Sequence, residues 1–487
     1  MAATGAESGE AVAESGGYEY DVVVVGGGPA GENVAGRVAA GGLSVALVER
    51  ERVGGECSFW ACMPSKALLR SGHAVTAARR VDGARQAVTG DIDVSGTLRR
   101  RDSFVDQWDD RRQVDWVHDA GVALFRGSAW LAGSREVMVR DPDGTTFSLY
   151  AGNAVVLATG SVPVRPPIPG LDQVDFWDSR AATSAERAPE SLAVLGAGVV
   201  GVELAQAWAR LGTHVRMIES GPRPLPSAPD FAGDLLEAAL RADGVRLYSD
   251  AVVNGVSSTE GSVTLELADG TEVSAERLLV ATGRRAATGH LGLESVGLHE
   301  EGAVDVNEHG EVRGVPGGWL YAAGDVTGQA QLTHQAKYAA RVVADVVVAR
   351  ATGRHVTTDA FGRYMTSANR HAVPTVIFTD PAVAQIGYSP ERAEQDGHRV
   401  RTIELDMASA GAELRADGYR GRARFVIDER HQVLLGAVFV GQDVAELLHA
   451  ATIAIVGEVP LARLWHAVPA FPTLSEVWLR LLESYGL

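Results

Sequence analysis

Apolar runs and glycine-rich turns alternate along the first half of the chain, and this pattern predicts its architecture. Residues 20–25 form an apolar run that is typical of a buried parallel strand. It leads into a turn, 26–31, that opens a helix ending at Ala39. A second predicted strand, 43–48, ends at Glu49. Strand, glycines, helix, strand and acid in this order predict a dinucleotide-binding fold.

The same arrangement occurs a second time further along the chain. A predicted strand at 191–195 leads into the turn 196–201 and a helix, and the next strand, 215–218, ends at Glu219. An Ala-Thr-Gly turn closes each copy, ending at Gly160 and Gly283. We therefore expect two similar domains, each binding a dinucleotide.

The remaining segments complete an α/β prediction of two Rossmann-like dinucleotide-binding domains plus a C-terminal α+β domain. Residues 65–120 are mostly helical in pattern, and the basic run 99–101 is expected on a solvated face. The expected limits are listed here in chain order: a disordered tail at 1–17, the first part of one dinucleotide-binding domain at 18–165, a second dinucleotide-binding domain at 166–295, the second part of the first domain at 296–360, and the C-terminal domain at 361–487.

Glycines suit these turns because they let the backbone approach a pyrophosphate, while the helix N-terminus supplies N–H donors. An acid at the end of the second strand can bind ribose hydroxyls, a role we expect for Glu49 and Glu219. A carboxylate at 219 repels a 2′-phosphate and favours NAD, although Arg223 is near in sequence and moderates this preference. The alternative is a tight turn without a ligand.

Composition narrows the possible functions. The 487 residues carry a formal net charge of −18, which argues against general binding to nucleic acid or to anionic membranes. No apolar run is long enough to span a membrane, and the N-terminus does not resemble a signal peptide. The chain has two cysteines at redox spacing, which suits a reducing cytoplasm.

The two cysteines, Cys57 and Cys62, lie five positions apart in a predicted helix. On one helical turn they can approach closely enough for a disulfide. Beside a flavin, such a dithiol can be reduced and can then attack an electrophile as a thiolate. Two small buried side chains are the simpler alternative. Zinc is less favoured, because no Cys or His cluster supplies the other ligands.

Together these motifs resemble the pyridine nucleotide–disulfide oxidoreductases, the family of dihydrolipoamide dehydrogenase, glutathione reductase and mercuric reductase. The shared features are the two fingerprints, Cys-x4-Cys-x-Pro-Ser-Lys, the Ala-Thr-Gly turns and Tyr-Ala-Ala-Gly-Asp. The resemblance implies that 18–165 and 296–360 are the two parts of an FAD-binding domain, that 166–295 is an NAD(P)-binding domain and that 361–487 is a C-terminal α+β dimerisation domain. It implies a homodimer that uses FAD and NAD(H) on a small-molecule substrate. The residues that it implies for FAD are Gly26, Gly28, Gly31, Glu49, Gly160 and Asp325. Those that it implies for the nicotinamide cofactor are Gly196, Gly198, Gly201, Glu219 and Gly283.

The resemblance also implies catalytic roles. Lys66 and Glu203 match an ion pair near the reactive flavin nitrogen. NADH passes hydride to FAD, FAD reduces the disulfide, Cys62 faces the flavin, and Cys57 exchanges with substrate. Other members add cysteines at their C-termini, but this chain ends Glu-Ser-Tyr-Gly-Leu, so mercury delivery is not expected.

One motif departs from the family. The lipoamide and glutathione enzymes carry His-Pro-Thr-x-x-Glu, whose His–Glu pair serves as acid and base. Here the stretch begins with Phe471 and ends with Glu476. Loss of a positioned base commonly costs about two to four powers of ten in rate. We expect His466 and His334 not to replace it, although neither is excluded as the base.

The prediction is therefore an FAD-dependent, NAD(H)-preferring oxidoreductase that passes electrons through Cys57 and Cys62 to a disulfide or other small electrophile, without the usual histidine. Two alternatives stay open. One is a proton-excluding carboxylase-type enzyme of the same fold, similar to 2-ketopropyl-coenzyme M carboxylase, which also carries Phe at this position. The other is a flavoprotein subunit without turnover of its own.

Overall fold

A computed structural model describes residues 17–487, which form two compact units. The first unit contains described residues up to 59 together with 108–162 and 284–369; the second contains 60–107, 163–283 and 370–487. Each unit is thus assembled from segments that are distant in sequence. The predicted tail lies outside the described residues apart from Gly17. The domain limits given above stay a prediction.

The first unit is built on a seven-stranded sheet. Strands β1, β2, β3, β6 and β16 are parallel, and an antiparallel edge follows β6. The strand order is β3 (Ala123–Arg126), β2 (Val45–Glu49), β1 (Tyr18–Val25), β6 (Thr146–Leu157), β5 (Glu136–Arg140) and β4 (Ser128–Gly133), with β16 (Leu320–Ala322) also paired to β6.

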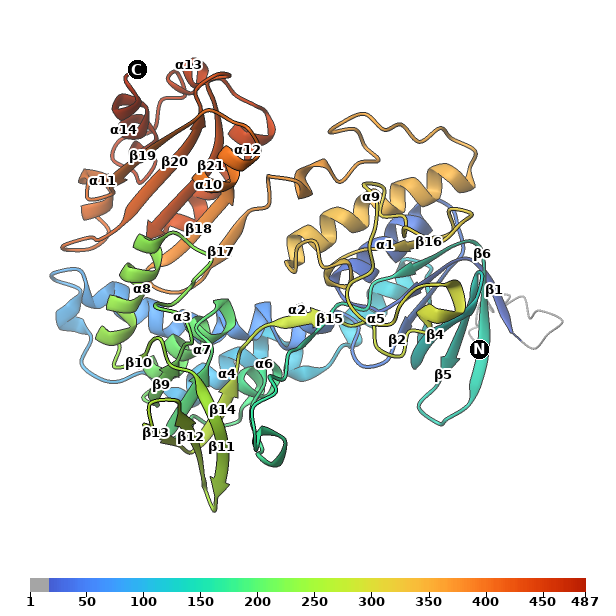
Figure 1. The fold of residues 1–487 in the computed structure, drawn as a ribbon, viewed down its shortest axis with the longest axis horizontal. Helices are drawn as coiled ribbons and strands as arrows, with labels where there is room; N and C mark the ends of the chain where they lie inside the picture. The colour runs from blue at the N-terminus through green and yellow to red at the C-terminus, as the bar shows by residue number, and fades with distance from the viewer. Residues whose placement is uncertain (1–16) are drawn as a thin grey trace, which may run out of the picture. The chain divides into compact units, whose positions relative to one another are not determined.

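The central strands of this sheet are apolar on both faces, and helices cover one of these faces. α1 (Pro29–Ala40) and α9 (Thr333–Ala351) lie side by side (Figure 1) and share one buried cluster with β1 and β6. Val22 and Val24 face this cluster, whereas Val23 and Val25 face a second cluster. The run predicted as a buried strand is therefore buried on both sides, as expected for a parallel sheet.

The second unit contains a four-stranded parallel sheet and a three-stranded antiparallel one. The parallel order is β10 (Arg246–Tyr248), β9 (His214–Ile218), β8 (Ser191–Leu195) and β14 (Arg277–Val280). The antiparallel strands are β11 (Val253–Thr259), β12 (Ser262–Leu267) and β13 (Glu272–Ala275). The helices in this part are α3 (Cys62–Arg79), α4 (Val94–Phe104), α6 (Ser179–Ser184), α7 (Val199–Arg210) and α8 (Asp230–Ala242).

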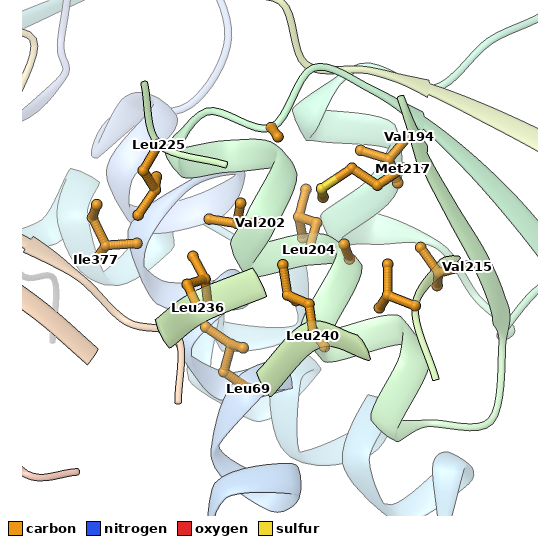
Figure 2. Close-up of a cluster of buried hydrophobic side chains, with 14 of the residues drawn as sticks. Leu69, Val194, Val202, Leu204, Val215, Met217, Leu225, Leu236, Leu240 and Ile377 are labelled. Carbon is orange, nitrogen blue, oxygen red and sulfur yellow. The ribbon is translucent and has the colours of Figure 1, made fainter. Parts of the chain in front are cut away.

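The core of this unit surrounds α7, whose residues 201–208 are all buried. Figure 2 shows Val202 and Leu204 of α7 among Leu69 of α3, Met217 of β9 and Leu236 of α8. Most neighbours of α7 are apolar, and the buried Glu203 and Gln206 have polar partners of their own. Within residues 17–487, no helix has both the length and the apolar character needed to cross a lipid bilayer.

The C-terminal segment forms a five-stranded antiparallel sheet, so the predicted α/β class with a C-terminal α+β part is confirmed. Its order is β17 (Thr375–Ile377), β18 (Ala382–Gly387), β21 (Val433–Gly441), β20 (Arg422–Asp428) and β19 (Val400–Asp406), with helices α10 (Pro390–Gln395), α12 (Leu448–Val456) and α14 (Glu476–Tyr485). β18 was not predicted, because its two alanines and Gln385 weaken the strand pattern.

The basic run at 99–101 corrects one expectation. Arg101 is only 2% exposed, and its guanidinium donates to the carbonyl oxygens of Thr183 and Ala185 at 3.0 and 2.7 Å. Asp102 accepts from the same side chain. The prediction of a solvated face is wrong at Arg101 because these oxygens and the carboxylate of Asp102 replace water around its charge.

A buried carboxylate organises the turn between β20 and β21. Oδ2 of Asp428 accepts hydrogen bonds from Nδ1 of His398 at 2.9 Å and Nδ1 of His431 at 2.8 Å. Its Oδ1 accepts from the main-chain N–H of Arg430 at 2.8 Å. Burial alone raises the pKa of Asp428, but the bonds from His431, His398 and the main chain outweigh it and hold the pKa well below its usual range.

We expect Asp428→Asn to lower the free energy of unfolding at pH 7 by about 1–3 kcal/mol, because it weakens several bonds to a buried charge. A depressed pKa stabilises the fold above the unfolded-state value of about 3.9, and this contribution is lost as pH falls through the folded-state value. Urea unfolding at pH 7 and at pH 2 measures both effects, and the gap in unfolding free energy between variant and wild type should narrow at pH 2, which lies below the unfolded-state value.

Glu429→Gln is the matched control, since the neighbouring Glu429 pairs with the largely exposed Arg399. Such surface pairs contribute about 0–1 kcal/mol. Equal losses in the two variants contradict the role given to Asp428.

Candidate functional site

The first glycine turn joins β1 to α1 and leaves a backbone surface open to a ligand. Gly26 has φ +104°, a conformation that favours glycine. A Cβ on Gly31 would lie 1.8 Å from the carbonyl oxygen of Gly26, so the helix and the turn pack without room for any side chain. A Cβ on Gly28 meets nothing within 4 Å, and Gly28 directly precedes the first turn of α1. This open side can admit a pyrophosphate to the helix N-terminus.

Glu49 closes the same turn from the end of β2. Its Oε2 accepts a hydrogen bond from the N–H of Gly27 at 2.6 Å, and its Oε1 accepts one from the N–H of Glu51 at 2.7 Å. Burial raises the pKa of Glu49, and these two hydrogen bonds oppose the rise. The carboxylate is therefore fixed beside the glycines, where a ribose diol would lie in this type of fold.

The second unit repeats this geometry. Gly196 has φ +100°, a Cβ on Gly201 would lie 2.0 Å from the oxygen of Gly196, and a Cβ on Gly198 meets nothing within 4 Å. Oε2 of Glu219 accepts from the N–H of Ala197 at 2.7 Å. The two turns thus share their contacts and not only their sequence pattern.

The Ala-Thr-Gly turns meet the glycine turns through their alanines. A Cβ on Gly26 would lie 2.5 Å from the oxygen of Ala158, and one on Gly196 would lie 2.7 Å from the oxygen of Ala281. Gly160 and Gly283 have φ +75° and +131°, and a Cβ on either meets nothing within 4 Å. In each copy, therefore, the alanine oxygen packs on the first glycine of the fingerprint.

Asp325 lies just beyond β16, at the same edge of the first sheet as Glu49. Oγ of Ser161 donates to its Oδ2 at 2.6 Å, and Nε of Arg284 donates to Oγ of Ser161 at 2.8 Å. Burial raises the pKa of Asp325, while Ser161 and Arg284 lower it. Sequence reasoning missed Ser161 and Arg284, although each directly follows an Ala-Thr-Gly turn.

The cysteines do not share one helix, so the expectation of a single helical turn is wrong. Cys57 lies in α2 (Gly55–Phe59), and Cys62 is the first residue of α3. Ala61 separates the helices with φ −122° and ψ −91°. A continuous helix turns through about 500° in five residues, which leaves the two side chains on different faces. Both cysteines are half-buried.

Lys66 lies one helical turn after Cys62 and forms an ion pair within the second unit. Its Nζ donates to Oε2 of Glu203 at 2.7 Å. Oε1 of Glu203 accepts from the N–H of Phe378 at 2.8 Å, and the Phe378 ring centre lies 4.9 Å from Nζ. The Glu203 side chain is 4% exposed. The ammonium group therefore lies between a buried carboxylate and an aromatic face, with part of its surface open to solvent.

A family comparison assigns the chain. Residues 20–340 match the family described as "Pyridine nucleotide-disulphide oxidoreductase". Residues 373–481 match the dimerisation domain of the same class. The chain belongs to this family. Its members are FAD-dependent oxidoreductases that act on sulfur groups, and the protein is an enzyme of this class.

Several characterised members of the family are similar over nearly the whole chain. A mercuric reductase from Acidithiobacillus ferrooxidans is 33% identical, and the match covers 95% of this chain and 81% of the relative. A dihydrolipoyl dehydrogenase from Thermus scotoductus is 32% identical and is matched over 96% of this chain and 97% of its own length. The HOCl-induced flavoprotein disulfide reductase RclA from Escherichia coli, solved as a Cu(II) complex, has a TM-score of 0.81 with 25% identity, covering 96% of this chain and 99% of RclA.

FAD is the flavin of this family, and the first unit of this oxidoreductase fits it. The open backbone at Gly28, the fixed carboxylate of Glu49 and the hydrogen-bonded Asp325 offer donors and acceptors for a pyrophosphate, a ribose and a polyhydroxy chain. The second turn offers the corresponding groups for a nicotinamide dinucleotide at Gly198 and Glu219.

The phenyl ring of Phe471, which the sequence predicts at the family's histidine position, is exposed. Phe471 is 74% exposed in the single chain. Glu476 is the first residue of α14, and its Oε2 is buried without a hydrogen-bond partner. His466 and His334 are both exposed. The roles of these residues stay predictions.

We expect Glu203→Gln to lower the free energy of unfolding by about 1–3 kcal/mol, because the amide leaves Lys66 without its carboxylate in a partly buried position. Denaturant unfolding of the two proteins measures the loss.

Glu237→Gln is the control, because Glu237 pairs with Arg241 four residues later on α8. Pairs at this helical spacing contribute about 0.2–0.5 kcal/mol. If Glu203→Gln costs no more than the control, the buried pair does not stabilise this unit.

Proposed function

We propose that the protein is an NAD(H)-preferring, FAD-dependent oxidoreductase, and that it works as a homodimer. Electrons pass through a redox-active Cys57–Cys62 disulfide to a disulfide or another small electrophile. With a disulfide RSSR as acceptor, the reaction is NADH + H⁺ + RSSR → NAD⁺ + 2 RSH. Two electrons move as hydride, and the two protons end on the thiols.

The ion pair of Lys66 and Glu203 is the observation that carries this proposal. α3 begins at Cys62 and carries Lys66 one turn later, while α7 begins at the second glycine turn and carries Glu203. The 2.7 Å bond between these side chains joins the cysteine-bearing helix to the dinucleotide-binding helix. A protein that used only one of these parts has no need of a buried charge pair between them.

Each residue of this arrangement has a distinct task. Bound FAD would supply a carrier for two electrons between the nicotinamide and the sulfur pair. The ammonium group of Lys66 favours negative charge near the flavin ring, and Glu203 fixes the position of that ammonium group. Cys62 is the thiolate that faces the flavin, and Cys57 exchanges with the substrate.

The preference for NADH rests on the end of β9. The Glu219 carboxylate accepts hydrogen bonds from the main-chain N–H groups of Ala197 and Gly221 at 2.7 and 2.8 Å. These bonds hold its negative charge where it would repel the 2′-phosphate of NADPH. Arg223, the cation that lies near Glu219 in the sequence, forms an ion pair with Asp230. This pairing weakens the case for Arg223 as a phosphate ligand.

Two observations support a homodimer. Residues 373–481 match the dimerisation domain of the family. In the single chain, Ile453, Val468 and Phe471 are 58%, 84% and 74% exposed, and large apolar side chains gain about 1.5–3 kcal/mol each when they are fully buried. A second copy that covers this part of the chain would remove them from water.

Anaerobic titration of the FAD-bound protein with NADH tests the proposal. The expected result is a long-wavelength absorption band from the Cys62 thiolate to oxidised flavin, which Cys62→Ser abolishes while Cys57→Ser retains it. NADPH should reduce the protein much less efficiently than NADH. Persistence of the band in Cys62→Ser refutes the role of this sulfur, and a clear advantage for NADPH refutes the role of Glu219.

Phe471→His tests the missing base. A histidine at this position can transfer protons to and from an exchanging thiol, so we expect turnover with lipoamide or a similar disulfide to rise by about 10²-fold or more. Steady-state NADH oxidation with a panel of disulfides and quinones measures the gain. Phe471→Tyr is the control, because it keeps the ring but supplies no base near neutral pH. Equal activity in the wild type and the two variants argues that no proton transfer is missing. Turnover by the wild type that depends on carbon dioxide favours the carboxylase-type alternative instead.

A further inference from the structure

Trp60 lies between the two cysteines and is held from two directions by one short helix. The guanidinium carbon of Arg180 lies 4.2 Å from the centre of the Trp60 ring. Oγ1 of Thr183 lies nearest to the carbonyl oxygen of Trp60, at 2.9 Å, and shares its hydroxyl donor between this oxygen and those of Ser179 and Arg180 in its own helix, at 3.0 and 3.1 Å. Arg180 and Thr183 both belong to α6, which is in the same unit as Trp60. The side chain and the main chain of Trp60 are thus bound by residues three positions apart.

The helix that holds Trp60 is itself fixed. Asp178 caps α6 by accepting from the N–H of Ala181 at 2.9 Å. The buried Arg101 donates to the oxygens of Thr183 and Ala185 at its C-terminal end. Each end of α6 therefore has a hydrogen bond to a free backbone group, and the short helix provides a defined support.

Trp60, which contacts α6, lies two residues before Cys62. The Trp60 oxygen bound by Thr183 belongs to the peptide that leads to Ala61, where α2 and α3 are separated. The next carbonyl oxygen, that of Ala61, accepts the N–H of Ser65 at 3.2 Å in the first turn of α3. The start of α3, and with it the backbone of Cys62, is therefore connected to α6 through one residue.

We propose that Trp60, Arg180 and Thr183 form a positioning device that sets the direction in which the Cys62 sulfur points. Arg180 and Thr183 act through Trp60 and do not themselves react. The inference rests on the proposed function in one respect, namely that the Cys62 sulfur faces the flavin. A displacement of about 1 Å at a reacting group can change a rate about 10²-fold, so a fixed approach to Cys62 has a direct chemical effect.

The proposed role predicts graded effects for a series of variants. Trp60→Ala removes the ring, Arg180→Gln removes the cation and Thr183→Val removes the hydroxyl donor. Trp60→Phe and Arg180→Lys keep an aromatic face and a positive charge, so they should restore part of the effect. A purely structural role for these residues would alter the unfolding midpoint without altering the behaviour of the Cys62 sulfur.

Two measurements on the FAD-bound protein test the proposal. The first is the long-wavelength thiolate-to-flavin absorbance per flavin after anaerobic reduction with NADH. The second is the rate at which iodoacetamide alkylates Cys62 in the dithiothreitol-reduced Cys57→Ser background. We expect Trp60→Ala and Arg180→Gln to lower the absorbance by about threefold or more and to change the alkylation rate by about tenfold, with Trp60→Phe and Arg180→Lys lying closer to wild type.

Arg401→Gln is the matched control. The Arg401 guanidinium lies 4.5 Å from the ring centre of Tyr485 in the C-terminal segment, so the substitution removes the same charge from a similar contact. We expect both measurements to stay at the wild-type value in this variant. A change there as large as in Arg180→Gln would mean that net charge, and not the contact with Trp60, causes the effect.

The outcomes separate this inference from the proposed function. If the wild type shows no long-wavelength band, the proposed function fails, while the alkylation rates still report whether Trp60 controls Cys62. If the wild type shows the band and the folded variants show the same band and alkylation rate, the positioning role is overturned. Should Trp60→Ala fail to bind FAD, Arg180→Gln and Thr183→Val decide the question, because both leave the Trp60 ring in place.

Discussion

The ion pair between Lys66 and Glu203 is the contact on which the arrangement of the second unit depends. It joins α3 to α7, and the Glu203 carboxylate also binds the main chain of Phe378 just after β17. Three segments that are far apart in sequence are thus tied to one buried carboxylate. Such a group is expensive to bury unless its oxygens find donors, and here the ammonium of Lys66 binds Oε2 and the main-chain N–H of Phe378 binds Oε1.

α7 binds the segment after β17 through two further polar side chains. Gln206 binds both the N–H and the carbonyl oxygen of Asp380 at 2.7 and 2.9 Å, and Arg210 binds the Asp380 carboxylate at 3.0 Å. Glu203, Gln206 and Arg210 are spaced three and four residues apart, so they share one face of α7. A polar stripe on an otherwise buried helix therefore fixes the connection between β17 and β18, while the remaining faces pack into the apolar core (Figure 2).

Much of this organisation could be predicted from the sequence, because it depends on local patterns. The glycine turns, the acids that follow β2 and β9, and the change to an antiparallel C-terminal sheet each have a short-range signature. Contacts that depend on distant partners could not be predicted. Arg101 resembles its exposed neighbours Arg99 and Arg100 in sequence, and only the carbonyl oxygens of α6 distinguish it. The break at Ala61 does carry a local signal that sequence reasoning missed, because Pro64 has no N–H to donate to the preceding turn and is tolerated only in the first turn of a helix.

The bond between Arg284 and Ser161 has a consequence for the connectivity of the chain. These residues flank the long segment 164–283, and Nε and Nη2 of Arg284 bind the hydroxyl and the carbonyl oxygen of Ser161, both at 2.8 Å. The neighbouring strands β7 (Ser161–Pro163) and β15 (Arg284–Ala286) are paired as well. The segment thus begins and ends at paired positions, so its two ends lie next to each other. Joining residues 163 and 284 directly would require little extra loop-closure entropy, so the parent sheet is topologically complete without its insert.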